Sequence, residues 1–142
     1  MSCNEFKRQI RVNSGAIIED EYRYLLWRGF IPSMPWITWI MLNPSTADAH
    51  VDDPTIRRVR NFSFDHKYGN VNVINLYALR STDPRALRGH SDPVGPDNDR
   101  YFKMLNETGG PVVCAWGAYA HLNGRDSDVV SMLSNCTLLC LG

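Results

Sequence analysis

The chain contains four short apolar runs that carry no charged residue. In the segments between these runs, apolar residues recur three or four positions apart. The runs predict buried strands, because they are rich in β-branched and aromatic residues and are too short for a buried helix. The segments between them predict amphipathic helices. The predicted strands are residues 36–42, 71–76, 112–116 and 137–141, and the predicted helices are residues 54–67, 97–108 and 126–133.

The alternation of strand and helix predicts a parallel sheet with helices on its faces. Residues 15–18 and 22–27, separated by the turn-like Glu19-Asp20-Glu21, predict an N-terminal β-hairpin in addition. The expected fold is therefore α/β, a three-layer α/β/α domain with a central, mostly parallel sheet and an N-terminal β-hairpin. We expect one domain over residues 15–142, preceded by residues 1–14 as a loose segment or an edge element.

The composition argues against some classes of function but does not identify one. The 142 residues carry 15 basic and 15 acidic side chains, so no overall field attracts nucleic acid or an anionic membrane, and any nucleic-acid surface must be a local patch. No apolar run approaches the roughly 20 residues of a membrane helix, and the first residues do not open a signal peptide. We therefore expect a cytoplasmic protein with no membrane partner.

The sequence lacks the motifs of several common classes of enzyme and nucleotide-binding site. Walker, GxGxxG, GxSxG and HExxH motifs are absent, which argues against P-loop, Rossmann, serine-hydrolase and zincin sites. The four cysteines show neither a CxxC pair nor zinc spacing, and we expect Cys114, Cys136 and Cys140 to be reduced core residues. No cofactor and no metal site is expected.

Polar or small residues follow three of the predicted strands. The carboxyl ends of parallel strands lie at one edge of the sheet, where α/β folds bind ligands. An asparagine there suits the reading of a base edge, and a tyrosine can stack a base. The alternative is that these residues only satisfy the backbone of turns. The expected substrate-binding residues are Pro44, Ser45, Thr46, Asn75, Tyr77, Trp116 and Gly117.

Asn43 and Asp48 are the candidate catalytic residues. Pro44 restricts the backbone after Asn43 and so gives its side chain a defined direction. Asp48 is the nearest carboxylate of an acidic run that ends at Asp53, and it can orient a water as general base. We interpret Asp53 as a helix cap, although several aspartates of this run could instead hold a hard cation.

A basic face is predicted on the first long helix and in the loop after the second core strand. Arg57 and Arg58 lie on the helix, and Arg80 lies in the loop. Such residues can contact the phosphates of a nucleic acid. The alternative is a charged helix face that is only solvated.

The run Ile-Met-Leu-Asn-Pro-Ser-Thr-Ala-Asp at residues 40–48 and the run at residues 51–58 resemble the DUF1643 family of bacterial and phage proteins. The runs at residues 75–84, 92–99 and 113–117 resemble it as well. The resemblance covers nearly all of residues 15–142. It implies a family without implying an activity.

The order of the motifs is also similar, more weakly, to the uracil-DNA glycosylase superfamily. The shared features are Asn43-Pro44 after the first core strand, Asn75 after the second, a proline-rich loop with a following helix, and Trp116-Gly117 after the third. This resemblance implies a glycosylase-like fold in which Asn43 positions the attacking water, Asn75 reads the base edge and Tyr77 stacks the base.

One departure concerns the second catalytic motif of glycosylases. DUF1643 proteins usually continue past the position of Gly142 with a segment that contains a His-Pro pair. We expect either a reduced site without this motif or a different catalytic histidine, such as His50 or His121.

Three hypotheses follow. The first is recognition of a nucleobase, a nucleotide or modified DNA, with hydrolysis of an N-glycosidic bond if the protein is an enzyme. The second is a non-catalytic, phage- or defence-related module that binds a protein or nucleic-acid partner. The third is a metal-dependent nucleotide hydrolase built on the aspartates of residues 48–53. The first hypothesis predicts that four side chains converge on one cavity: Asn43, Asp48, Asn75 and Tyr77.

Overall fold

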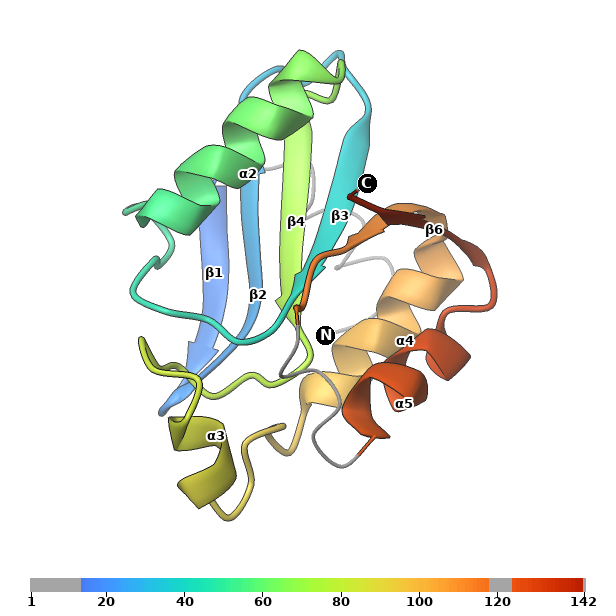
Figure 1. The fold of residues 1–142 in the computed structure, drawn as a ribbon. Helices are drawn as coiled ribbons and strands as arrows, with labels where there is room; N and C mark the ends of the chain where they lie inside the picture. The colour runs from blue at the N-terminus through green and yellow to red at the C-terminus, as the bar shows by residue number, and fades with distance from the viewer. Residues whose placement is uncertain (1–13, 118–123, 142) are drawn as a thin grey trace.

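The computed structural model describes residues 14–117 and 124–141. The prediction for residues 1–14 thus lies outside the described residues, except for Ser14, which begins the first strand. Figure 1 shows the arrangement of the elements. In chain order they are β1 (Ser14–Glu19), β2 (Tyr22–Gly29), β3 (Trp36–Met41), α2 (Pro54–Asp65), β4 (Asn70–Asn75), α3 (Ala86–Gly89), α4 (Asn98–Thr108), β5 (Gly110–Cys114), α5 (Arg125–Met132) and β6 (Cys136–Cys140).

The strands form a six-stranded sheet in the order β1-β2-β4-β3-β5-β6. The neighbours from β4 to β6 are parallel, whereas β1, β2 and β4 pair antiparallel. The α/β class is confirmed, but the sheet is mixed rather than mostly parallel. The reason is that β2 joins the sheet directly by pairing with β4, a contact that the local pattern of β2 does not reveal.

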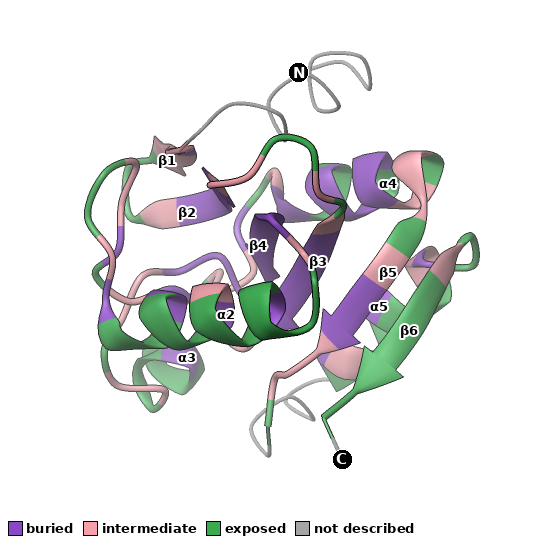
Figure 2. Cartoon of the chain, turned by 90° about the horizontal axis from the view of Figure 1, so that it is seen from above, coloured by how far each residue is buried: buried purple, intermediate pink, exposed green. Residues whose placement is uncertain are grey.

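The sheet has a separate apolar core on each face. On one face, α2 places Ile56 and Val59 over side chains of the central strands. On the other face, α4 and α5 contribute Phe102, Leu105 and Val129. Figures 1 and 2 show α2 on the opposite side of the sheet from α4, with β3 and β4 buried at the centre and β6 exposed at the edge.

The start of α2 agrees with its sequence signal. Asp53 is the N-cap, its Oδ1 accepts the backbone N–H of Ile56 at 2.9 Å, and Pro54 occupies the first turn. The prediction of core cysteines is wrong for Cys140, which lies exposed on the edge strand β6, whereas Cys114 and Cys136 are half-buried. None of the described helices combines the length and the apolar composition that a membrane span requires.

The carboxyl ends of the central strands meet where the chain changes direction. β3 leads into α2 on one face, whereas α5, the next described helix after β5, packs on the other face. Neighbouring parallel strands with connections on opposite faces leave a crevice beyond their carboxyl ends. Met41 pairs with Asn75 in the register of β3 and β4, so Asn43 and Asn75 both lie at this crevice.

Candidate functional site

A cavity of about 180 Å³ lies at the ends of β3, β4 and β5, beside the first turn of α2. We call it the strand-end cavity. Its apolar wall consists of Met41, Leu42, Pro44, Ile56 and Ala115. Its polar side chains are Arg23, Asn43, Ser45, Asp53, Thr55 and Asn75.

Arg23, on β2, contributes a buried positive charge to this cavity and is 2% exposed. Its Nη1 donates to the carbonyl of Ala47 at 3.1 Å and its Nη2 donates to Oδ1 of Asn75 at 3.4 Å. Burial lowers the pKa of Arg23 to about 10, and the Asp53 carboxylate opposes this effect. The guanidinium therefore remains charged at neutral pH. Its buried Nε has no partner among the described residues, and an unpaired buried donor costs about 1–3 kcal/mol.

The two asparagines of the cavity are oriented by their neighbours. Oδ1 of Asn75 accepts from Arg23, which turns its amide nitrogen to the other side as a donor. The two N–H groups of Asn43 Nδ2 are shared among three carbonyls, which leaves its Oδ1 as an acceptor. The carbonyls belong to Pro44, Leu79 and Ser81, at 3.2, 3.3 and 3.0 Å. Asn43 therefore satisfies turn backbone and lines the cavity at the same time.

The loop between β3 and α2, residues 42–53, is held by arginines from other elements. Arg23, Arg28 and Arg80 donate to its backbone carbonyls. The accepting carbonyls are those of Ser45, Thr46, Ala47, Asp48, Ala49 and Val51. These bonds replace the regular backbone pairing that an irregular loop lacks. The cavity wall is thus ordered by side chains that are distant in sequence.

The predicted catalytic residue Asp48 does not line the cavity. Its Oδ1 accepts the backbone N–H groups of His50 and Val51, both at 2.9 Å, and these bonds hold the pKa of Asp48 below its ordinary value. His50 is exposed in the same turn, and His121 lies outside the described residues. The carboxylate that does line the cavity is Asp53, whose Oδ2 accepts the N–H of Ala47 at 3.3 Å.

We expect the stability of the protein to depend on pH through Asp52, which lies in this loop. It accepts from Arg28 at 2.8 Å and from Arg60 at 2.6 Å. Burial raises the pKa of Asp52, but the two arginines outweigh burial and lower it. A carboxyl whose pKa is lowered on folding stabilises the protein above its unfolded pKa of about 3.9, and this contribution is lost as pH falls through the folded pKa. We expect the free energy of unfolding, measured in urea at pH 7 and pH 3, to fall more for the wild type than for Asp52→Asn. Equal falls would contradict this assignment.

Four of the predicted substrate-binding residues lie outside the strand-end cavity. Tyr77 is 1% exposed within the core, and burial raises its pKa. Trp116 packs at the margin of the core under α4 and α5. Thr46 and Gly117 are exposed. The cavity brings together the remaining three, Pro44, Ser45 and Asn75, with Asn43.

The predicted phosphate contacts divide into two groups. Arg57 and Arg58 are exposed on α2, and their role stays a prediction. Arg80 is engaged with the carbonyls of Ser45 and Thr46, at 3.3 and 3.2 Å. In this position, Arg80 helps to order the loop 42–53.

A family model described as "Protein of unknown function (DUF1643)" matches residues 23–142. The chain belongs to the DUF1643 family. The match begins at Arg23, so all residues that line the strand-end cavity lie within the DUF1643 region. The search of the curated proteins found no match, and the search of the solved structures found none.

Two residues of the cavity were not predicted from the sequence of this DUF1643 chain to lie beside Asn43 and Asn75. Arg23 alternates with tyrosines, which is typical of a strand with one solvated face, and Asp53 was interpreted as a helix cap or as one of several aspartates that could hold a cation. Arg23 is buried because β2 pairs with β4 and the loop 42–53 crosses over it. The available signal was a charged residue inside the otherwise apolar segment Tyr22–Leu26.

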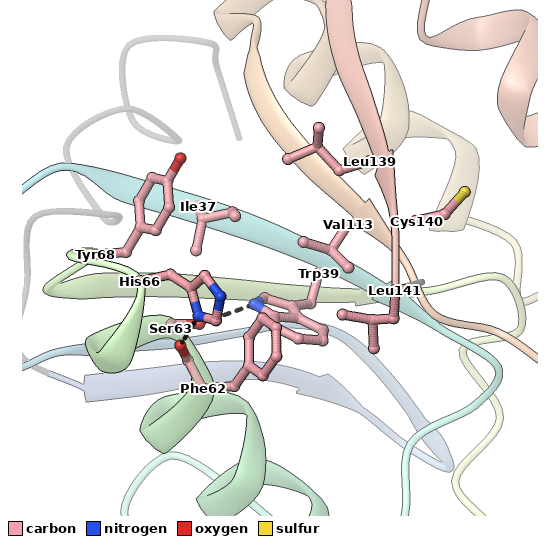
Figure 3. A pocket seen from close by; sticks show the side chains of 10 residues that line it. All are labelled: Ile37, Trp39, Phe62, Ser63, His66, Tyr68, Val113, Leu139, Cys140 and Leu141. Atoms are coloured by element: carbon pink, nitrogen blue, oxygen red, sulfur yellow. Dashed lines mark hydrogen bonds between the residues drawn. The ribbon is translucent and has the colours of Figure 1, made fainter.

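A larger groove of about 610 Å³ lies between α2 and β6 (Figure 3). Phe62 packs edge-on against Trp39, whose Nε1 donates to Oγ of Ser63 at 2.9 Å. Figure 3 shows Leu139 of β6, and Leu141 just after this strand, along the opposite wall. The groove is mostly apolar, and none of the predicted site residues lines it. The strand-end cavity is therefore the candidate site.

Proposed function

We propose that this DUF1643 chain recognises a nucleobase or a nucleotide, free or within modified DNA, in the strand-end cavity. The observation that carries the proposal is the convergence of Asn43, Ser45 and Asn75 from the ends of two neighbouring strands. Arg23 lies in the same cavity and orients Asn75. Convergent donors and acceptors in a small, partly apolar cavity are the usual means of fixing a flat polar ligand.

The same arrangement supports a relation to the uracil-DNA glycosylase superfamily. In that scheme the fold is a three-layer α/β/α arrangement, Asn43 follows the first parallel strand and holds the attacking water, and the helix α2 presents Arg57 and Arg58 to DNA phosphates. Hydrolysis also needs a carboxylate beside the water. Asp53 is better placed than Asp48 for this role, because it lines the cavity.

The second candidate is a binding module without catalysis. It is favoured by the position of Asp48 in turn hydrogen bonds and of Tyr77 in the core. Such a module would use the same cavity and loop to bind a nucleic-acid or protein partner. The metal-dependent hydrolase has less support, since Asp52 is paired with two arginines and Asp53 accepts two backbone N–H groups. Among the described residues, no three His, Cys, Asp or Glu side chains form a group suited to a metal ion.

Recognition is tested by titrating the protein with a panel of nucleosides and mononucleotides, followed by NMR. We expect saturable binding that Ser45→Phe abolishes by filling the cavity mouth. Ser127→Phe, an exposed position on α5, is the matched control and should bind like the wild type. Absence of binding by the wild type would overturn the proposal.

Hydrolysis is tested by mass spectrometry of free bases released from ordinary and phage-modified DNA. Release that disappears in Asn43→Ala would establish glycosylase chemistry and identify the base. Because the amide nitrogen of Asn43 also binds the surrounding backbone carbonyls, a melting curve must show that the variant is folded. Nucleoside binding without any release would favour the binding module.

A further inference from the structure

Two cysteines lie side by side on the last two strands of the sheet. Cys114 ends β5 and Cys140 ends β6, and the parallel register of these strands pairs the two residues directly. Figure 2 shows β6 beside β5 at the edge of the sheet. Residues that are paired in register project to the same face of a sheet. The two thiols are therefore neighbours, although the helix α5 lies between them in the sequence.

Both thiols lie on the face of the sheet that α4 and α5 cover. Cys114 follows Val113, whose side chain belongs to the core under α2, so Cys114 projects to the opposite face. Figure 3 shows the side chain of Cys140 on the opposite side of β6 from those of Leu139 and Leu141. The nearness of the two thiols has an electrostatic effect as well. Burial raises the pKa of Cys114 to about 11, and the charge of the Cys140 thiolate adds to this rise.

The spacing of neighbouring strands suits a disulfide bond between Cys114 and Cys140. Paired strands lie about 4.8 Å apart, within the range of about 4.4–6.8 Å that separates the Cα atoms of disulfide-bonded cysteines. The Cβ atoms of a disulfide lie closer together, at about 3.5–4.5 Å. β6 must therefore move slightly toward β5, and it can do so because it is the edge strand and pairs only with β5 among the described strands. A disulfide formed at this cost is easily reduced again.

The two thiols differ in their access to solvent. Cys140 is exposed, whereas Cys114 is half-buried, and both are free thiols in this structure. A dissolved oxidant therefore reacts with Cys140 first. The thiol of Cys114 lies beside it and is the group that completes the bond.

We propose that Cys114 and Cys140 form a reversible disulfide by exchange with small disulfides of the glutathione type. The thiolate of Cys140 attacks oxidised glutathione, which forms a mixed disulfide and releases one glutathione thiolate. The thiolate of Cys114 then attacks the sulfur of Cys140, which forms the bond between the two cysteines and releases the second glutathione. The protein loses two protons and two electrons, and the two released glutathione molecules take them up. Neither cysteine lines the strand-end cavity, so this inference is independent of the proposed recognition of nucleobases.

The first test maps the bond in the wild-type chain. The reduced protein is incubated with oxidised glutathione at pH 8, the remaining thiols are alkylated, and a tryptic digest is analysed by mass spectrometry without reduction. Cleavage after Lys103 and Arg125 places Cys114 in one peptide and Cys140, together with Cys136, in the next. We expect these two peptides to be linked, with Cys140 identified by fragmentation. An excess of reduced glutathione should separate them.

The second test shows whether the folded sheet selects the pair. Cys136→Ser is the matched control, because Cys136 also lies on β6 but is paired with Gly110, and this variant should keep the linkage. Cys114→Ser and Cys140→Ser should lose it. In concentrated urea the wild type should link Cys114 to Cys136 as well as to Cys140, since the register of the strands is then absent. If a serine variant fails to fold in a melting experiment, the wild type with and without urea decides the question.

Four results would overturn the inference. They are a wild-type chain in which both thiols stay free, glutathione that remains attached to Cys140, a dimer linked through Cys140, and equal linkage of Cys136 and Cys140 to Cys114 in the folded protein. None of them bears on the binding of nucleosides, so the proposed function stands or falls by its own titration.

Discussion

Replacement of Arg28 by methionine is expected to lower the free energy of unfolding by about 3–5 kcal/mol, because it leaves several backbone carbonyls without their donor at about 1–3 kcal/mol each, while Asp52 keeps its second partner, Arg60. Arg28 is 4% exposed. Its Nε donates to Asp52 at 2.8 Å, and its Nη groups donate to the carbonyls of Trp27 and Ala49 at 2.9 and 3.2 Å. Methionine keeps the apolar stem and removes every one of these donors. Urea denaturation measures the effect.

Two further variants show whether this loss comes from the guanidinium. Arg28→Lys keeps the charge but has no planar fork of donors, so we expect it to recover only part of the stability. Arg58→Met, on the exposed face of α2, should change the free energy by less than about 0.5 kcal/mol. A loss below about 1 kcal/mol for Arg28→Met would show that the loop 42–53 does not depend on this arginine.

Asn98→Ala is expected to cost about 2 kcal/mol of stability and to weaken ligand binding in the strand-end cavity. Asn98 is fully buried at the start of α4. Its Nδ2 donates to the carbonyls of Asn75 and Leu76, both at 3.0 Å, just where β4 ends. Its loss leaves buried carbonyls without their donor, each costing about 1–3 kcal/mol, although Arg125 still donates to Leu76. The released strand end carries Asn75, which lines the cavity.

The matched control for this prediction lies on the same helix. Lys103→Ala changes an exposed residue in the middle of α4 and should alter neither stability nor binding. Urea denaturation and nucleoside titration are measured for both variants. Unchanged nucleoside affinity in a destabilised Asn98→Ala protein would show that the end of β4 does not organise the cavity.

Most secondary structure could be predicted because its signals are local. The expected strand at residues 71–76 is observed at Asn70–Asn75, and the helix expected from Pro54 begins at Pro54. An apolar run and an aspartate cap act within a few residues, so no long-range contact is needed to recognise them. The order of the strands depends on pairing between distant segments, and the antiparallel contact of β2 with β4 has no local signal.

The candidate site was predictable in part for the same reason. Asn43 and Asn75 each end a strand, and the parallel pairing of β3 with β4 is enough to bring strand ends together. Asp48 and Tyr77 stand close to these residues in sequence, yet one lies in an exposed turn and the other in the core. Spacing along a loop does not specify which side chains turn inward.

The sequence by itself determined the α/β class, the DUF1643 family, the start of α2 and the polar strand ends. All of these depend on the pattern or the identity of residues that lie close together in the sequence. Only the tertiary structure decided that the sheet is mixed, that Asp53 faces the cavity, and that Arg23 lies buried beside it. The burial of a charge depends on every segment that packs around it, and the loop that covers Arg23 begins nineteen residues later in the chain, at residue 42.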